Sequence, residues 1–270
     1  MPELPEVETT CKGIKPHIVG QIVKQVVVRE KRLRWPIANN LNAKLKDQTI
    51  IAVARRAKYI CIQTAKGYLI IHLGMSGTVR IVSNENVLKK HDHFDCVFNN
   101  GIILRFNDPR RFGAVLWAVN LNDLKIMANL GPEPLEKVFH AKYLHEMSKR
   151  RRIPIKDLIM NNQVVVGVGN IYASESLYLS AIHPQMPSNQ LSYQQAGALV
   201  KAIQKTLKQA IAKGGTTLKD FYHSDGKPGY FKQQLKVYGR GGMDCISCKN
   251  KLEEIRLGQR STVHCPICQK

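Results

Sequence analysis

The N-terminus combines a proline with a carboxylate in a way that could form a covalent intermediate with a sugar. The chain begins Met1-Pro2-Glu3, so removal of the initiator methionine would leave a secondary α-amine beside a carboxylate. An α-amine has a pKa of about 7.7–8.0, against about 10.4 for lysine, so part of it is unprotonated at neutral pH. Its attack on a sugar carbon gives an iminium ion that withdraws electrons and favours elimination. The alternative is that these residues only begin a helix.

Four cysteines near the C-terminus have the spacing of a metal site. They form two pairs with two residues inside each pair, Cys245 with Cys248 and Cys265 with Cys268. This spacing is typical of a four-thiolate zinc site in which each pair lies at the turn of a hairpin. Two disulfides or unligated thiols are the alternatives. The pattern predicts one structural zinc ion, because four thiolates leave no open position for chemistry.

Three basic side chains stand where they could bind phosphates. Lys58 and Lys156 occur in short charged stretches, and this pattern fits solvated side chains as well as phosphate ligands. Arg260 stands five residues before Cys265, near the expected tip of the second zinc hairpin. A guanidinium that is rigidly placed there would suit a phosphate.

The segment from Val164 to Asn170 contains two glycines, Gly167 and Gly169. A dinucleotide-binding fingerprint would need a third glycine at position 172, which is Tyr172, so we expect no nucleotide cofactor. We instead predict a tight turn into a helix that Asn170 caps, whose backbone N–H groups can hold a phosphate. An ordinary capped turn without a ligand is the alternative.

Two loops carry a methionine, an arginine and a phenylalanine. Met75 lies in the segment 72–77, and Arg110 and Phe112 lie in the segment 107–113. In a protein bound to a duplex, such side chains on adjacent loops could enter the base stack and replace an extruded base. Without that context, Met75 and Phe112 would more often belong to the hydrophobic core, so both interpretations stay open.

The elements that must position these residues change along the chain. Residues 20–120 contain short β-branched runs that indicate a β-sandwich or barrel, with Cys61 and Cys96 as buried strand residues. A linker at 130–134 is followed by helical patterns. The expected strands cover 22–28, 50–53, 68–71, 102–104 and 114–117, and the expected helices cover 155–160, 171–179 and 192–213.

The charge of the chain indicates a nucleic-acid partner. Its 41 basic and 20 acidic residues give a formal net charge of +21, which is the electrostatic footprint of a nucleic-acid binder. A membrane surface is the competing anion. However, no stretch approaches the roughly 18 consecutive apolar residues of a spanning helix, and the first residues lack the apolar core of a signal peptide. We therefore expect a cytoplasmic protein without a membrane partner.

Together these motifs resemble the bacterial formamidopyrimidine-DNA glycosylase family over essentially the whole chain. The matching segments are 2–6, 57–59, 72–77, 107–113, 167–173, 214–217 and 260–262 with the four cysteines. The resemblance implies an α+β multidomain fold. Its expected parts are an N-terminal catalytic β-sandwich with an N-terminal helix over 1–130, a helix-two-turn-helix domain over 131–234 and a zinc-finger β-hairpin over 235–270.

The resemblance also implies roles for individual residues. Pro2 would be the nucleophile, Glu3 the acid that protonates the deoxyribose ring oxygen, and Lys58 a phosphate ligand that assists catalysis, as does Arg260. The segment 216–231 looks like the loop that covers an oxidised purine. The implied DNA contacts are Met75, Arg110 and Phe112 in the base stack, and His72, His91, Lys156, Asn170 and Arg260 around the lesion.

The function that follows is base excision repair of oxidised purines. We expect a monomeric, nucleoid-associated DNA glycosylase and abasic-site lyase that removes 8-oxoguanine or formamidopyrimidines from double-stranded DNA and cleaves the strand by β,δ-elimination. Its cofactor would be one structural zinc ion. An endonuclease VIII-like glycosylase for oxidised pyrimidines is the alternative enzyme, because that group shares the N-terminus. A non-catalytic zinc-ribbon DNA-binding protein is the alternative from another class.

Overall fold

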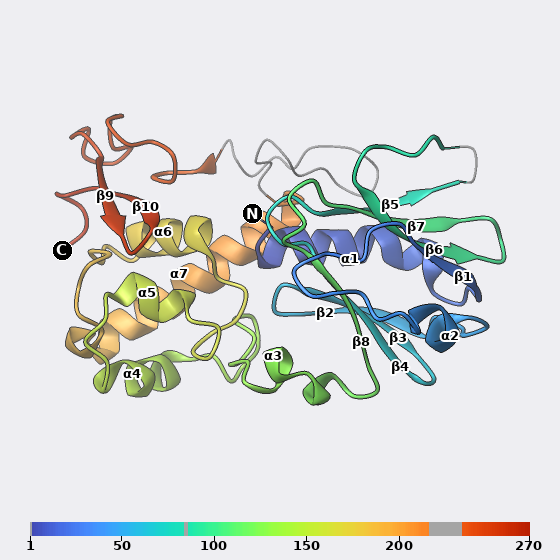
Figure 1. The fold of residues 1–270 in the computed structure, drawn as a ribbon. Helices are drawn as coiled ribbons and strands as arrows, with labels where there is room; N and C mark the ends of the chain where they lie inside the picture. Colours follow the sequence, from blue (N-terminus) through green and yellow to red (C-terminus); the bar gives the residue numbers. More distant parts are fainter. Residues whose placement is uncertain (1, 84–85, 216–233) are drawn as a thin grey trace. The chain divides into compact units, whose positions relative to one another are not determined.

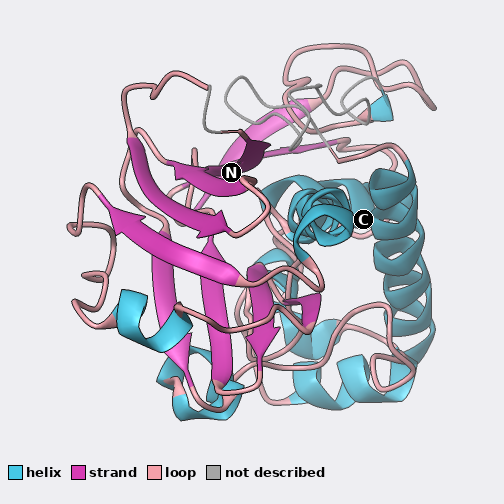
Figure 2. Cartoon of the chain, turned by 90° about the vertical axis from the view of Figure 1, so that its right-hand side faces the viewer, coloured by secondary structure: helices cyan, strands magenta, loops and turns pink. Residues whose placement is uncertain are grey.

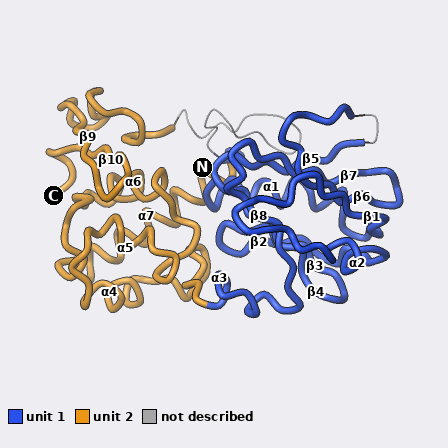
Figure 3. Tube along the Cα trace, viewed as in Figure 1, with its two compact units in different colours: residues 1–128, 213–232 blue, residues 129–212, 233–270 orange. Residues whose placement is uncertain are grey.

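The computed structural model describes residues 2–83, 86–215 and 234–270. The segment 216–231, expected to cover the damaged base, lies outside the described residues. The chain divides into two compact units (Figure 3): unit 1 comprises 1–128 and 213–232, and unit 2 comprises 129–212 and 233–270. The three domain boundaries expected from the sequence stay a prediction.

Unit 1 begins with the helix α1, Leu4–Ile18. Its apolar side chains recur at helical spacing, and Leu4, Val7, Ile14 and Ile18 are fully buried. One face of α1 therefore packs into the core, where it contacts β2, β3 and β5. The start of α1 is fixed by a capping box, in which the side chains of Glu3 and Glu6 each accept a hydrogen bond from the other residue's backbone N–H.

Two antiparallel four-stranded sheets form the β-sandwich of unit 1 (Figures 1 and 2). One has the strand order β1-β6-β7-β5 and the other β2-β3-β4-β8. The strands are β1 Val23–Val28, β2 Ala52–Arg56, β3 Tyr59–Thr64, β4 Gly67–His72, β5 Thr78–Val82, β6 Asp92–Phe98, β7 Ile103–Asn107 and β8 Ala114–Ala118. Two short helices, α2 Leu41–Leu45 and α3 Lys125–Ala128, and a 3₁₀ turn, Leu121–Asp123, complete the unit.

The two sheets and α1 share one hydrophobic core. Phe94, Phe98 and Phe106 from the first sheet pack in the same cluster as Ile60 and Ile71 from the second. The β-branched and aromatic runs of the sequence form these strands because such side chains pack well on a pleated, buried surface. The expected strand residues Cys61 and Cys96 are buried in β3 and β6, as predicted.

Unit 2 is helical and ends in a β-hairpin. Its helices are α4 Ala141–Lys149, α5 Ile155–Met160, α6 Asn170–Leu179 and α7 Tyr193–Ala212, with a 3₁₀ turn at Ser188–Gln190. The hairpin consists of β9 Glu253–Leu257 and β10 Arg260–His264. Residues Ile171 to Tyr178 are all buried, and α6 packs against α5, α7 and β10. The β-sandwich, the helices and the C-terminal hairpin confirm the predicted fold class.

Among the described helices, none combines the length and the apolar character that crossing a bilayer requires.

Candidate functional site

Pro2 and Glu3 lie at the beginning of α1, and both are buried. The N–H of Glu3 donates a hydrogen bond of 2.8 Å to Oε2 of Glu6, and Glu3 is only 2% exposed. Gly215 approaches the same point, because a Cβ on this residue would lie 3.0 Å from Oε1 of Glu6. These residues do begin a helix, as the alternative interpretation of the sequence expected. The start of this helix also places the proposed nucleophile and the proposed acid next to each other.

Lys58 lies in the two-residue turn between β2 and β3. Ala57, the other turn residue, has a φ of +53°, so the turn uses the left-handed region that suits tight hairpins. Arg55 ties this turn to α1, since its guanidinium donates to the carbonyl of Ala57 at 2.9 Å and to the carboxylate of Glu8 at 2.9 Å. These contacts fix the backbone from which Lys58 projects, and its side chain is half-buried.

His72 ends β4 and pairs with Tyr59 across the sheet, with ring centroids 4.8 Å apart. Burial, together with the positive charges of Lys58 and Arg34, lowers the pKa of His72 to about 4. The ring is therefore neutral at neutral pH. Its Nδ1 accepts the N–H of Gly74 at 3.1 Å, so the proton resides on Nε2. His72 is a neutral hydrogen-bond donor of fixed tautomer.

The buried carboxylate of Asp108 joins the two loops that carry Met75, Arg110 and Phe112. Its Oδ1 accepts the hydroxyl of Ser76 at 2.9 Å, and its Oδ2 accepts the N–H of Gly113 at 2.8 Å. Asp108 is fully buried. A buried carboxylate that accepts hydrogen bonds from both loops holds them in one arrangement.

Met75 and Phe112 are 38% and 47% exposed, so the interpretation that they belong to the core is wrong. The loops are in direct contact, because a Cβ on Gly74 would lie 2.5 Å from the backbone of Phe112. The guanidinium carbon of Arg110 lies 4.9 Å from the ring centroid of Phe112, a distance at which a cation and an aromatic face attract each other. The structure thus brings these three side chains to one place on the surface of unit 1.

His91 joins the same loops through the backbone. Its carbonyl accepts the N–H of Asp108 at 3.1 Å, and its ring lies 5.9 Å from that of His93. Nε2 of His93 in turn lies 2.9 Å from the carbonyl of Asp108. His91 is half-buried, so its ring stands beside the Arg110 loop with part of its surface accessible to a ligand.

Lys156 lies on α5 of unit 2, and the interpretation as a solvated lysine is wrong. Only 1% of the residue is exposed, and its ammonium donates to the hydroxyl of Thr262 on β10 at 2.6 Å. A buried ammonium is retained only where partners satisfy its charge and its donors.

Asn170 is the first residue of α6 and does not cap it. The cap residue is Gly169, so the predicted cap was wrong by one position. The amide nitrogen of Asn170 instead donates to the carbonyl of Ser261 at 3.0 Å. Within the described part of the chain, its buried Oδ1 has no hydrogen-bond partner. Lys156 and Asn170 therefore contact adjacent residues of the hairpin.

Arg260 is the first residue of β10 and is exposed. It pairs with Leu257 across the hairpin turn, in which Gly258 has a φ of +56°. This confirms its predicted position at the hairpin tip. Because Ser261 and Thr262 follow it directly, Lys156, Asn170 and Arg260 are brought together in unit 2.

The four cysteines form one cluster at the base of the hairpin, with their Sγ atoms within 4.8 Å of one another. Burial opposes ionisation of Cys245, but hydrogen bonds from the Cys248 backbone and the Tyr178 hydroxyl lower its pKa to about 6. By contrast, hydrogen bonds with Cys248 and Cys265 raise the pKa of Cys268 to about 12, and each of the four thiols must lose its proton to bind a metal ion. Four cysteine sulfurs at these separations could bind one metal ion.

Two buried side chains of α6, which hold the segment 236–247 that carries the first cysteine of the cluster, were not predicted from the sequence. Glu175 accepts backbone N–H groups from the three consecutive residues 236–238 at 2.9–3.0 Å. Tyr178 places its hydroxyl 3.2 Å from Sγ of Cys245 and 2.7 Å from Oγ of Ser247. The only signal in the sequence was a carboxylate and a phenol inside a strongly apolar helical segment.

Comparisons with known proteins agree along the whole chain. Residues 1–115 match the formamidopyrimidine-DNA glycosylase N-terminal domain, and residues 130–222 match the H2TH domain of the same enzymes. The formamidopyrimidine-DNA glycosylase of Serratia proteamaculans is 52% identical over 270 residues and covers 100% of both chains. That of Pasteurella multocida is 50% identical with the same coverage.

Solved structures are similar over the same length. The MutM (Fpg) protein from Thermus thermophilus has a TM-score of 0.89 and 34% identity, and the match covers 99% of this chain and 98% of that chain. The wild-type Fpg of Lactococcus lactis, crystallised with DNA containing N7-benzyl-Fapy-dG, has a TM-score of 0.90 and 31% identity with full coverage of both. The chain therefore belongs to the formamidopyrimidine-DNA glycosylase family, and it is a DNA glycosylase of base excision repair.

Proposed function

We propose that this glycosylase removes 8-oxoguanine and formamidopyrimidines from double-stranded DNA and then cleaves the strand at the abasic site. The observation that carries this proposal is the pair Pro2 and Glu3, buried together at the start of α1 in a chain that matches the family from end to end. The Lactococcus lactis relative crystallised with formamidopyrimidine-containing DNA supports the substrate class.

In the first step, the amine of Pro2, exposed by removal of Met1, attacks C1′ of the damaged nucleotide. The bond between C1′ and the base breaks, and the base leaves with the electron pair and takes up a proton, which balances the proton that the proline nitrogen loses after its attack. Glu3 protonates the ring oxygen O4′, so the sugar opens and a cationic iminium forms between the proline nitrogen and C1′. The buried position of Glu3 beside Pro2 supports this role, because both groups must reach the same sugar.

Two eliminations then cleave the strand. The iminium acidifies the proton at C2′, and its loss expels the 3′ phosphate; a second elimination along the conjugated system expels the 5′ phosphate. Lys58 would hold a phosphate beside the reacting sugar, and Arg260 would hold another. Both cations stabilise the negative charge of the leaving phosphates.

The remaining residues would bind and distort the DNA. We propose that Met75, Arg110 and Phe112 fill the space left by the extruded nucleotide. Their exposure and their shared anchor, Asp108, support this role. Backbone phosphates would be held by His72, His91, Lys156, Asn170 and Arg260.

We propose zinc as the ion of the cysteine cluster. A set of four thiolates is a tetrahedral zinc site, and a closed coordination sphere gives the ion a structural role. The ion would hold the hairpin in the conformation that brings Arg260, Ser261 and Thr262 to α5 and α6. We further propose that the protein acts as a cytoplasmic monomer on nucleoid DNA.

A panel of duplexes with one lesion each tests the substrate. We expect 8-oxoguanine and formamidopyrimidines to be excised faster than oxidised pyrimidines, and 8-oxoguanine faster opposite cytosine than opposite adenine. The guanidinium of Arg110 can donate to the acceptors of an orphaned cytosine, whereas adenine offers fewer acceptors. Faster excision of oxidised pyrimidines would favour the endonuclease VIII-like alternative. Binding without any excision would favour a non-catalytic zinc-ribbon protein.

A further inference from the structure

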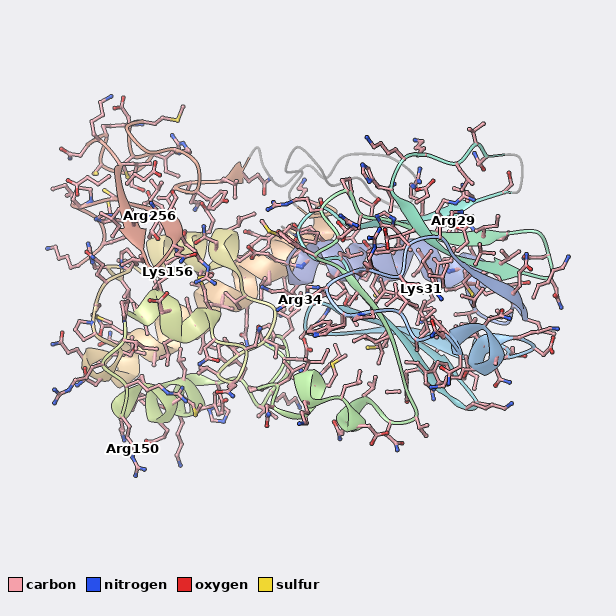
Figure 4. The ribbon with its side chains drawn as sticks, in the orientation of Figure 1. Arg29, Lys31, Arg34, Arg150, Lys156 and Arg256 are labelled. Carbon is pink, nitrogen blue, oxygen red and sulfur yellow. The ribbon has the colours of Figure 1, made fainter. Side chains whose placement is uncertain are left out.

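The segment 29–37, between β1 and α2, carries four basic residues and is anchored against the β-sandwich. Leu33 and Ile37 are 8% and 3% exposed, and the N–H of Ile37 donates to the carbonyl of Lys31 at 3.1 Å, which closes the segment on itself. Figure 4 labels Arg29, Lys31 and Arg34, three of its basic side chains. Buried apolar residues therefore fix the backbone from which these cations project.

Three of the four cations are already bound to partners within the segment or nearby. The guanidinium of Arg29 donates to Asp95 at 2.6 Å, the ammonium of Lys31 donates to Asn39 at 2.9 Å, and the guanidinium of Arg32 donates to Glu30 at 2.7 and 2.8 Å.

Arg34 differs from these three. Among the described residues, no acidic or carbonyl group accepts a hydrogen bond from its guanidinium. Its guanidinium carbon instead lies 4.8 Å from the ring centroid of Trp35, and the residue is exposed. Stacking on an aromatic ring restrains an arginine while leaving its donors directed to solvent. Arg34 is therefore a restrained cation whose N–H groups are available to an external anion.

Arg34 also lies beside the proposed DNA-binding residues of unit 1. Its backbone N–H donates to the carbonyl of Gly113 at 3.1 Å, directly after Phe112. Its charge acts on the His72 ring, whose pKa is lowered first by burial, then by Lys58 and then by Arg34. Burial raises the pKa of Tyr59, and the charge of Arg34 opposes that shift. The guanidinium thus stands within electrostatic reach of His72 and Lys58.

We propose that Arg34 is a further DNA-binding residue, whose guanidinium binds a backbone phosphate of the duplex next to the phosphates held by Lys58 and His72. The inference rests on the proposed function, because DNA is taken as the ligand. The fork of guanidinium donors matches a phosphate, and the stack on Trp35 reduces the side-chain entropy that binding would otherwise remove. Arg32, two residues earlier, cannot serve in this way while Glu30 holds it.

The test compares Arg34→Gln with Arg32→Gln as a matched control. Both substitutions lower the net charge by one on the same segment, so they change the long-range field of the protein about equally. Binding to a duplex with a stable abasic-site analogue is measured against salt concentration. We expect Arg34→Gln to lower the salt slope by about one unit and to weaken binding about tenfold at low salt, the loss of one charged hydrogen-bonding contact. Arg32→Gln should keep the wild-type slope.

Two further variants separate binding from folding. Arg34→Lys keeps the charge but loses the fork, so the slope should be retained while affinity falls. Arg34→Met keeps an apolar side chain against Trp35. If Arg34→Gln unfolds at a lower temperature than the wild-type protein, the binding measurement uses Arg34→Met in its place. The backbone bond to Gly113 is present in every variant. Equal slopes for the Arg34 and Arg32 variants would overturn the inference alone, whereas failure of the wild-type protein to bind the abasic-site duplex would overturn the proposed function.

Discussion

Glu3 is both the N-cap residue of α1 and the proposed catalytic acid, and one substitution separates the two roles. In Glu3→Gln the amide oxygen can still accept a backbone N–H, so the fold should persist, but the side chain can no longer donate an acidic proton. We expect single-turnover excision of 8-oxoguanine to fall by about 10²–10⁴-fold, the range for a lost general acid. Cleavage of a preformed abasic site should fall less, because no base has to leave. Equal losses on the two substrates would contradict the role of Glu3 in base release.

The lowered pKa of His72 predicts an acid-sensitive contribution to stability. Its folded value of about 4 lies below the ordinary value of 6.5. As pH falls from about 6.5 to 4, the unfolded chain takes up a proton that the folded chain does not, and the free energy of unfolding decreases. Above this window the residue contributes no pH dependence. Denaturant unfolding at pH 7 and pH 5 should show a smaller decrease for His72→Gln than for the wild-type protein. An equal decrease would contradict a ring that stays neutral in the folded protein.

The residues that could be predicted from sequence are those whose chemistry is local. Pro2 and Glu3 are adjacent in the chain. The spacing of the cysteine pairs is sufficient to predict a cluster, and the structure confirms it. Lys156 and Asn170 could not be predicted in the same way. Their environment depends on Thr262 and Ser261, 106 and 91 residues further along the chain. No local pattern indicates that a lysine in a charged stretch will be buried by a distant hairpin.

At the scale of elements, the five expected strands coincide with or overlap β1, β2, β4, β7 and β8, and the residues around Cys61 and Cys96 form β3 and β6. β5 was not predicted, and neither was the exposure of the loops between the strands. Met75 and Phe112 are exposed on two loops that Asp108 connects, since it binds Ser76 from one loop and the backbone N–H of Gly113 from its own. Hydrophobicity alone would place both side chains in the core. The arrangement of these loops depends on a tertiary contact between Asp108 and Ser76, which are 32 residues apart in the sequence. Such a contact leaves no periodic pattern in the sequence.

Asp108→Asn should therefore loosen the two loops without changing the sandwich. The carboxamide has one acceptor oxygen where the carboxylate has two. Its NH₂ group would therefore face either the Ser76 hydroxyl or the Gly113 N–H, and the present hydrogen bond from that donor would be lost. We expect the free energy of unfolding to fall by about 1–3 kcal/mol, the cost of an unsatisfied buried partner. Preference for cytosine opposite 8-oxoguanine should also decrease, because Arg110 is no longer held in place. Competition kinetics on the two duplexes measure this preference, and an unchanged preference would separate Asp108 from the positioning of Arg110.

At the scale of the whole molecule, the cysteine cluster links metal content to DNA binding. We expect elemental analysis to find one zinc ion per chain. Removal of zinc by a chelator should abolish DNA binding, because the hairpin that carries Arg260 loses its fixed conformation. Cys265→Ser should lose both zinc and DNA binding. Cys11→Ala is the control, since Cys11 is buried on α1 and lies outside the cluster. Active protein without zinc would contradict the structural role of the ion.

The proposed reaction depends most directly on the covalent bond between Pro2 and the sugar. Borohydride reduction during the reaction with 8-oxoguanine DNA should convert the iminium to a stable amine and leave the protein attached to the damaged strand. Proteolysis and mass spectrometry should then locate the sugar on the N-terminal peptide, with Pro2 as its first residue. An adduct on Lys58, or the absence of any adduct from protein that excises the base, would contradict the central claim.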